Sequence, residues 1–258
     1  MIIELIWKEI LGKRKLLLVL GRSLVVCGIF CIFASYFFSI ICFLVWFIFI
    51  LKNMKVEVNP MDTIRAEAFE LWMSSPMPMV TLTKTFDVSR VVKVSKKLGV
   101  GFNALLCWCI GKAASQLEMF YLLPEQGKLF KYDSLAINVI VKNRKGGINS
   151  CDIPFVEDKK LFVEEYKVLT NKVSEECKSV FLEDYMIVGT SAMIQTELDC
   201  IVNQYTDKFC NPMVMWGKYR KRLFSVILPI SFQFHHVQMD GGDGARFLDL
   251  LQREIYKI

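Results

Sequence analysis

The order of apolar and polar positions divides most of the chain into short helices and strands. Apolar residues recur at helical spacing in four main segments, which are 64–74, 103–117, 159–180 and 242–258. Alternating or continuous apolar runs predict strands in 79–88, 128–142, 185–193 and 223–237. Because helices and strands mix without strict βαβ alternation, the sequence predicts an α+β fold of the two-layer sandwich type, with a mixed β-sheet and helices on one side.

Two predictions concern single positions in this pattern. Asp87 is expected to cap a further helix over 88–98, and Gly99 is expected to end it. The strand over 223–237 is nearly all apolar, which is typical of a strand in the middle of a sheet.

The first part of the chain has a different pattern. From Ser23 to Leu51 there is no charged residue, and a bilayer span needs only about 20 residues. Basic residues precede and follow this stretch. Three interpretations stay open: a membrane anchor, which includes a re-entrant hairpin; upstream sequence joined to a gene whose translation starts at Met54 or Met61; and a buried helix. We place a boundary at Lys52, so residues 1–53 form an apolar leader and residues 54–258 one domain of ordinary size.

Composition narrows the classes of function. The net charge of +6 is mild, and no stripe of Lys and Arg of the kind found in nucleic-acid-binding proteins is present. The nine cysteines form no C-x-x-C pair, and there are only two histidines, so neither a disulfide framework nor a Cys/His metal site is expected. We interpret the cysteines as reduced thiols of a cytoplasmic protein.

The only two histidines are adjacent, in "FQFHHVQMDGGDGARF" over 232–247. His236 ends the apolar strand, and Asp240 and Gly241 lead into the last helix. An imidazole at such a strand-to-helix turn can accept a proton at neutral pH. In the competing interpretation His236 is a hydrogen-bonded core residue and Asp240 is only the N-cap of the helix.

This stretch resembles the active-site signature of the chloramphenicol acetyltransferase family, two histidines followed by three variable residues and Asp-Gly. The run "PMVMWGKY" over 212–219 and the strand "VILPISFQFHH" also resemble that family, as do "IRAEAFELW" near the start and "GTSAM" at 189–193. The likeness spans about residues 60–258. It implies the fold of that family and a homotrimer with each site at a subunit interface.

The resemblance also implies roles for single residues. His236 would be the general base that takes a proton from a substrate hydroxyl, which then attacks the thioester of acetyl-CoA. Ser191 would donate a hydrogen bond to the oxyanion. Asp240 would pair with Arg65 to support the turn, and Gly241 would make the turn tight. The alternatives are a strand hydroxyl at 191 satisfied by the backbone and a solvated arginine at 65.

Three further positions concern the ligands. Trp72 matches an aromatic residue of the family's substrate pocket, although a buried helix tryptophan is equally consistent. Met215 stands where the family has a threonine that contacts CoA, and Ile140 lies near the position of a pocket threonine. Ile194 and Gln195 replace a Pro-Trp pair. These departures put chloramphenicol itself in doubt as the acceptor.

The sequence thus predicts an acetyl-CoA-dependent O-acetyltransferase that acts on a hydroxyl of a small molecule such as chloramphenicol. The alternative is a catalytically inactive acyltransferase scaffold that acts as a membrane-tethered ligand-binding or regulatory protein. Acetyl-CoA is a cytosolic metabolite, so the domain is expected in the cytoplasm, anchored to a membrane if residues 23–51 are a genuine anchor. No metal and no nucleic acid are expected.

Overall fold

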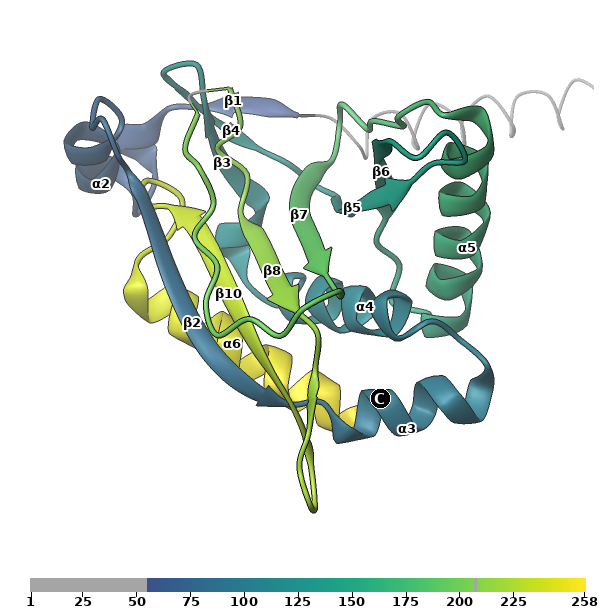
Figure 1. The fold of residues 1–258 in the computed structure, drawn as a ribbon. Coiled ribbons are helices and arrows are strands. Elements are labelled where there is room, and N and C mark those ends of the chain that lie inside the picture. The colour runs from purple at the N-terminus through teal and green to yellow at the C-terminus, as the bar shows by residue number, and fades with distance from the viewer. Residues whose placement is uncertain (1–54, 207) are drawn as a thin grey trace, which may run out of the picture. The chain divides into compact units, whose positions relative to one another are not determined.

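The computed structural model describes residues 55–206 and 208–258 (Figure 1). The leader, including the predicted anchor over 23–51, lies outside these residues. In the described part of the chain, no helix is both long enough and apolar enough to span a membrane.

The order of the elements matches the sequence pattern closely. The helices are α2 (Ala66–Trp72), α3 (Ser89–Leu98), α4 (Phe102–Ala114), α5 (Lys159–Glu176) and α6 (Gly241–Lys257), with short 3-10 turns at Pro60–Asp62 and Glu118–Tyr121. The strands are β1 (Val56–Val58), β2 (Met79–Asp87), β3 (Leu122–Glu125), β4 (Lys128–Lys131), β5 (Leu135–Lys142), β6 (Ile148–Pro154), β7 (Met186–Met193), β8 (Met213–Gly217), β9 (Arg220–Lys221) and β10 (Val226–His235).

The main sheet is mixed, as the sequence predicts. Its strands follow the order β2-β10-β8-β7-β5-β6, and β9 pairs with the outer end of β10. The pairs β5–β7 and β7–β8 are parallel, whereas the remaining pairs are antiparallel. A small second sheet joins β1, β4 and β3.

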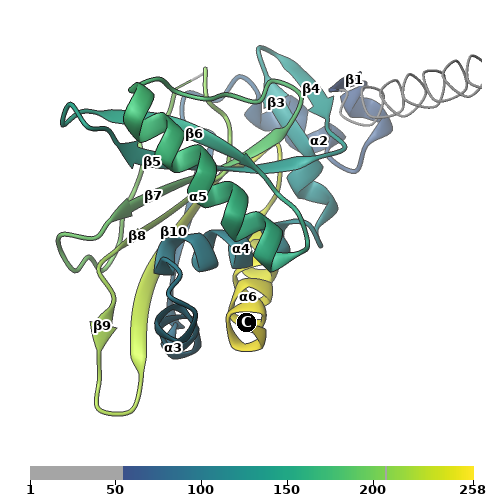
Figure 2. The same ribbon diagram turned by 90° about the vertical axis from the view of Figure 1, so that its right-hand side faces the viewer.

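Helices α3 to α6 form the layer on one face of the main sheet (Figure 2). The apolar positions of β10 alternate toward them: the ring of Phe232 lies 4.5 Å from that of Phe247 on α6 and 5.9 Å from that of Phe120. Every residue of β10 from Leu228 onward is buried, which confirms that this strand is central. The predicted α+β fold is therefore correct.

The odd-numbered residues of β10 face the opposite side, where the segment between β7 and β8 crosses the sheet. Ser231 Oγ accepts a hydrogen bond from Ile201 N at 2.9 Å, and Gln233 Oε1 accepts one from Asn203 N at 3.2 Å.

The predicted element ends are mostly confirmed. Gly99 ends α3 with a left-handed backbone (φ 64°), and Asp87 Oδ1 accepts the Ser89 N–H at 2.9 Å at its start, although Val88 holds the N-cap position. The pattern does not identify β6, because only part of this strand is apolar. Among the described cysteines, Cys107, Cys109, Cys151, Cys177 and Cys200 are free thiols.

Candidate active site

The backbone and ring of His236 are held at the end of β10. Its N–H donates to Pro78 O at 2.8 Å, and its ring stacks on Trp72 with centroids 4.8 Å apart and planes 14° apart. Nδ1 is buried without a partner, while Nε2 is not among the buried atoms and forms no hydrogen bond with any of the described residues. An imidazole fixed in this way presents one ring nitrogen to a substrate.

Arg65 connects α2 to the turn after β10. Its Nε donates to Val237 O at 2.9 Å, and its Nη2 donates to His236 O at 2.6 Å. Its Nη1 lies 3.7 Å from Asp240 Oδ2, and the residue is only 7% exposed. The predicted pair with Asp240 is therefore present, and the same guanidinium also binds the carbonyl group of His236 itself.

Asp240 has two structural tasks. Its side chain accepts the Asp243 N–H at 3.0 Å, and Asp243 returns a bond to the Asp240 N–H, which makes a capping box at the start of α6. The pKa of Asp240 lies below its ordinary value mainly because its carboxylate accepts the hydrogen bond from the Asp243 N–H. Gly242 and Arg65 lower it by smaller amounts. Gly241 needs no special backbone here, because its φ is not positive and a Cβ would meet nothing within 4 Å.

His235 differs from its neighbour because it is fully buried and faces the other side of the sheet. Its Nδ1 accepts the Val237 N–H at 3.1 Å, so the proton of the neutral ring lies on Nε2. Burial lowers the pKa of His235 to about 4. His235 therefore stabilises the turn as a neutral ring and cannot serve as an accessible base.

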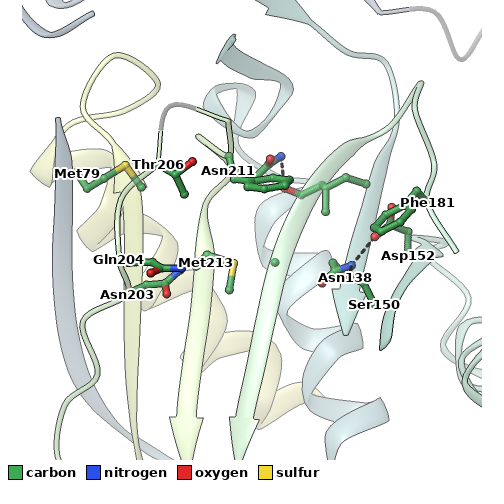
Figure 3. A pocket seen from close by; sticks show the side chains of 13 residues that line it. Met79, Asn138, Ser150, Asp152, Phe181, Asn203, Gln204, Thr206, Asn211 and Met213 are labelled. Atoms are coloured by element: carbon green, nitrogen blue, oxygen red, sulfur yellow. Dashed lines mark hydrogen bonds between the residues drawn. The ribbon is translucent and has the colours of Figure 1, made fainter. Parts of the chain in front are cut away.

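A pocket of about 280 Å³ opens on the sheet face opposite the helices (Figure 3). Its lining is formed by Met79, Asn138, Ser150, Asp152, Phe181, Ile187, Gly189, Asn203, Gln204, Thr206, Phe209, Asn211 and Met213. These residues come from β2, β5, β6, β7, β8 and the segments next to them. We refer to it as the sheet pocket.

The family model described as chloramphenicol acetyltransferase matches residues 53–252. The chain belongs to the chloramphenicol acetyltransferase family. It is 22% identical over 195 residues to chloramphenicol acetyltransferase 3 of Escherichia coli, covering 73% of this chain and 91% of that protein. To chloramphenicol acetyltransferase 2 of Escherichia coli it is 20% identical over 203 residues, covering 77% and 94%.

Solved structures give the same fold for this family member. A chloramphenicol acetyltransferase structure superposes with a TM-score of 0.68 at 18% identity, over 78% of this chain and all of that one. The catalytic core of a 2-oxoacid dehydrogenase multienzyme complex from Thermoplasma acidophilum superposes with a TM-score of 0.56 at 15% identity, over 78% and 97%. Membership of the chloramphenicol acetyltransferase family supports an acyltransferase activity.

Two of the predicted site residues, Ser191 and His236, lie far apart within a single chain. Ser191 on β7 is level with Met215 on β8, and Met215 is level with Ser231 on β10. His236 lies five positions beyond Ser231 and two strands away from Ser191, a separation of roughly 15 Å or more. Ser191 and His236 of the same chain therefore cannot bind one reacting group.

The predicted ligand residues are placed differently from expectation. Met215 is only 2% exposed, so its side chain has almost no surface to offer to CoA. Ile140 is 46% exposed and does not line the sheet pocket, to which β5 contributes Asn138 instead. Trp72 contacts His236 and does not line the pocket. The ligand contacts expected of Met215 and Ile140 stay predictions.

Three lining residues of the sheet pocket, Asn138, Asp152 and Gly189, were not among the site residues that the sequence predicts. Asn138 Nδ2 donates to Ser150 Oγ and to Asp152 Oδ1, both at 2.6 Å. The sequence offers only a weak indication of these residues. Asp152 stands between the apolar residues Cys151 and Ile153, and a polar residue in that place is also consistent with a loop.

Proposed function

We propose that this protein is an acetyl-CoA-dependent O-acetyltransferase with His236 as the general base. The observation that carries the proposal is the ring of His236, which is clamped by Trp72, Pro78 and Arg65 while its Nε2 stays open. Rigid positioning of an imidazole within reach of the substrate is what general-base catalysis needs. Family membership supports acetyl-CoA as the co-substrate.

The proposed step moves one proton and one acetyl group. Nε2 of His236 takes the proton of the acceptor hydroxyl while its oxygen attacks the carbonyl carbon of acetyl-CoA. The tetrahedral intermediate then collapses, the carbon–sulfur bond breaks, and the proton passes from His236 to the CoA thiolate. His236 returns to the neutral form, and no acyl-enzyme is formed.

We further propose that the working unit is a homotrimer in which two chains complete each site. Ser191 lies on the sheet face that carries the pocket, and the strand register places Ser191 far from His236 of its own chain. The pocket lining itself extends to Met79, the register partner of His235. A second chain that brings its His236 to the pocket would unite the base, the acceptor and the Ser191 hydroxyl. In such a site Ser191 would lie along the same strand as Gly189 of the pocket and could donate to the oxyanion.

The test is the release of free CoA, followed with a thiol reagent. Purified full-length protein with acetyl-CoA and chloramphenicol, or another small hydroxyl compound, should release CoA only when the acceptor is present. His236→Ala should lower the rate by roughly 10²- to 10⁴-fold while the circular dichroism spectrum and the melting temperature stay close to those of the wild type.

The matched control for that variant is Arg90→Ala, an exposed arginine on α3 away from His236, which should keep the wild-type rate. Wild-type turnover by His236→Ala would show that His236 is not the base. Absence of both acceptor-dependent CoA release and acetyl-CoA binding would instead identify an inactive scaffold.

A further inference from the structure

The floor of the sheet pocket is one row of residues across neighbouring strands. Met213, Gly189, Asn138 and Asp152 are paired in register on β8, β7, β5 and β6. Partners in register point to the same face of a sheet. Gly189 adds no side chain, and a Cβ there would lie 2.0 Å from Met213 Sδ. The floor therefore has an apolar half at Met213 and a polar half at Asn138 and Asp152 (Figure 3).

Asp152 is the one charged residue among the thirteen that line the pocket, and no lysine or arginine is in that set. It is 3% exposed and forms no ion pair with any described residue. Its Oδ1 accepts from Asn138 Nδ2 at 2.6 Å and its Oδ2 from Leu182 N at 2.9 Å. A carboxylate has about four acceptor sites, so both oxygens can accept further hydrogen bonds.

None of the described residues that line the pocket brings a positive charge to Asp152. A buried carboxylate without a cationic partner is costly, and a ligand that supplies the cation removes this cost. Burial also raises the pKa of Asp152, although the hydrogen bonds from Asn138 and Leu182 oppose this.

Asn138 adds an acceptor beside the carboxylate. Both of its Nδ2 bonds go to Ser150 and Asp152, so its Oδ1 is left without a partner among the described residues. Neighbouring lining residues, Phe181 and Met213, are apolar. This end of the pocket therefore matches a ligand with a cationic hydrogen-bond donor at one end and an apolar body next to it.

We propose that the acceptor is an amino alcohol whose protonated amine binds Asp152 and Asn138. Its apolar body would lie along Met213, and its hydroxyl would receive the acetyl group. This inference rests on the proposed function, because it names the substrate class of that site. The ammonium keeps its proton throughout, so oxygen and not nitrogen forms the new bond to the acetyl carbon.

A matched pair of compounds tests the charge. Chloramphenicol and its deacylated amine, 2-amino-1-(4-nitrophenyl)propane-1,3-diol, share the ring and the diol, but only the second carries an ammonium. Calorimetry with the full-length protein at pH 7 should give an affinity for the amine at least roughly tenfold higher than for the neutral amide. Equal affinities, or no binding of the amine, would overturn the proposal.

Asp152→Asn should reduce the preference for the amine over chloramphenicol to less than about twofold. Asp152→Glu, which keeps the charge, should retain part of that preference. Glu164→Gln removes an equal charge from the exposed face of α5 and should leave the preference unchanged. Retained binding of chloramphenicol by Asp152→Asn shows that the variant is folded. A preference for the amine that survives in that folded variant would contradict the role of Asp152.

The wild-type protein offers a second test that does not depend on a variant. The amine stays protonated below pH 7, so its affinity should fall as the pH is lowered through the raised pKa of Asp152, while the affinity for chloramphenicol should stay constant. A parallel change for both compounds would count against Asp152 as the binding group.

CoA release separates this proposal from the proposed function. Binding of the amine that depends on Asp152, without any CoA release, would contradict the proposed function and leave the ligand class intact. Faster acetylation of chloramphenicol than of the amine would contradict the proposal that the acceptor is an amino alcohol. It would leave the proposed acetyltransferase activity intact.

Discussion

At the scale of single residues, two adjacent histidines differ because successive strand residues face opposite ways. His235 lies under the segment that crosses the sheet and is fully buried, so its ring is neutral and bound to the Val237 N–H. His236 follows the strand end and stacks on Trp72, with Nε2 open. Identical side chains thus have one structural and one proposed chemical role, decided by burial.

The burial of His235 predicts a loss of stability in acid. The folded protein keeps this ring neutral down to about pH 4, whereas the unfolded chain protonates it near its ordinary value of 6.5. The unfolded state therefore binds more protons below pH 6.5, and stability falls as the pH is lowered from 6.5 to 4, by about 3 kcal/mol from this residue.

Urea denaturation at several pH values measures this effect. His235→Asn cannot titrate, yet its amide oxygen can still accept the Val237 N–H, so its stability should depend less on pH across this window. The same slope in the variant and the wild type would show that His235 is not the titrating group.

Arg65 predicts a linked loss of stability and activity. Arg65→Ala removes two hydrogen bonds of a buried guanidinium, to the His236 and Val237 carbonyl groups, and its ion pair with Asp240, whose side chain is 53% exposed. We expect a loss of about 3 kcal/mol in the free energy of unfolding and a lower kcat, because the turn that holds His236 loosens.

Arg90 offers a matched control for Arg65, since its Nε also donates to a backbone carbonyl, that of Ile258 at 3.0 Å, but it is exposed and distant from the turn. Arg90→Ala should cost under about 1 kcal/mol and leave kcat unchanged. Wild-type kcat in Arg65→Ala would show that Arg65 does not position the base.

At the scale of elements, the approach of α6 to the sheet fixes the start of the helix behind His236. Gly244 in its first turn lies so close to the sheet that a Cβ would be 2.7 Å from Phe234 Cε1 and 2.8 Å from Leu82 Cδ1. The capping box of Asp240 and Asp243 fixes the backbone of the same first turn of α6. The helix start and the strand end therefore support one another.

Gly244→Ala should therefore destabilise the protein by about 1–3 kcal/mol, because the added methyl group overpacks against the buried Phe234 ring. Gly241→Ala is the matched control on the same turn, where a Cβ meets nothing, and its effect should stay within about 0.5 kcal/mol. Thermal denaturation of both variants measures the difference. Similar melting temperatures for the two would contradict the close approach of α6.

At the scale of the whole molecule, Ser191 and His236 of one chain lie too far apart to bind the same reacting group. The sheet pocket and Ser191 share one sheet face, while His236 sits beyond the end of β10. A site shared between chains accounts for this separation. Light scattering should then give a mass about three times that of the 29.8 kDa chain.

Mixed assemblies test the shared site directly. Gly189→Trp should block the sheet pocket, and His236→Ala should remove the base, so each variant alone should be inactive. Coexpressed variants should regain CoA release, because the open pocket of one chain would meet the intact His236 of another. No recovery in mixed trimers would place the complete site within a single chain.

The sequence by itself determined the class of fold and the position of the proposed base. Helical and alternating periods are local, so α3 with its Gly99 end, the central strand β10 and the closing helix α6 all follow from neighbouring residues. The two histidines and Asp240 lie within one short stretch, and the likeness of Arg65 to the family was enough to predict their pair.

The sheet pocket was decided only by the tertiary structure. Met213, Gly189, Asn138 and Asp152 come from four strands, and only the register of their backbone hydrogen bonds brings them into one row. Burial likewise separates His235 from His236, and it removes Met215 from the surface. Register and burial depend on contacts between distant segments, and no local pattern contains that information.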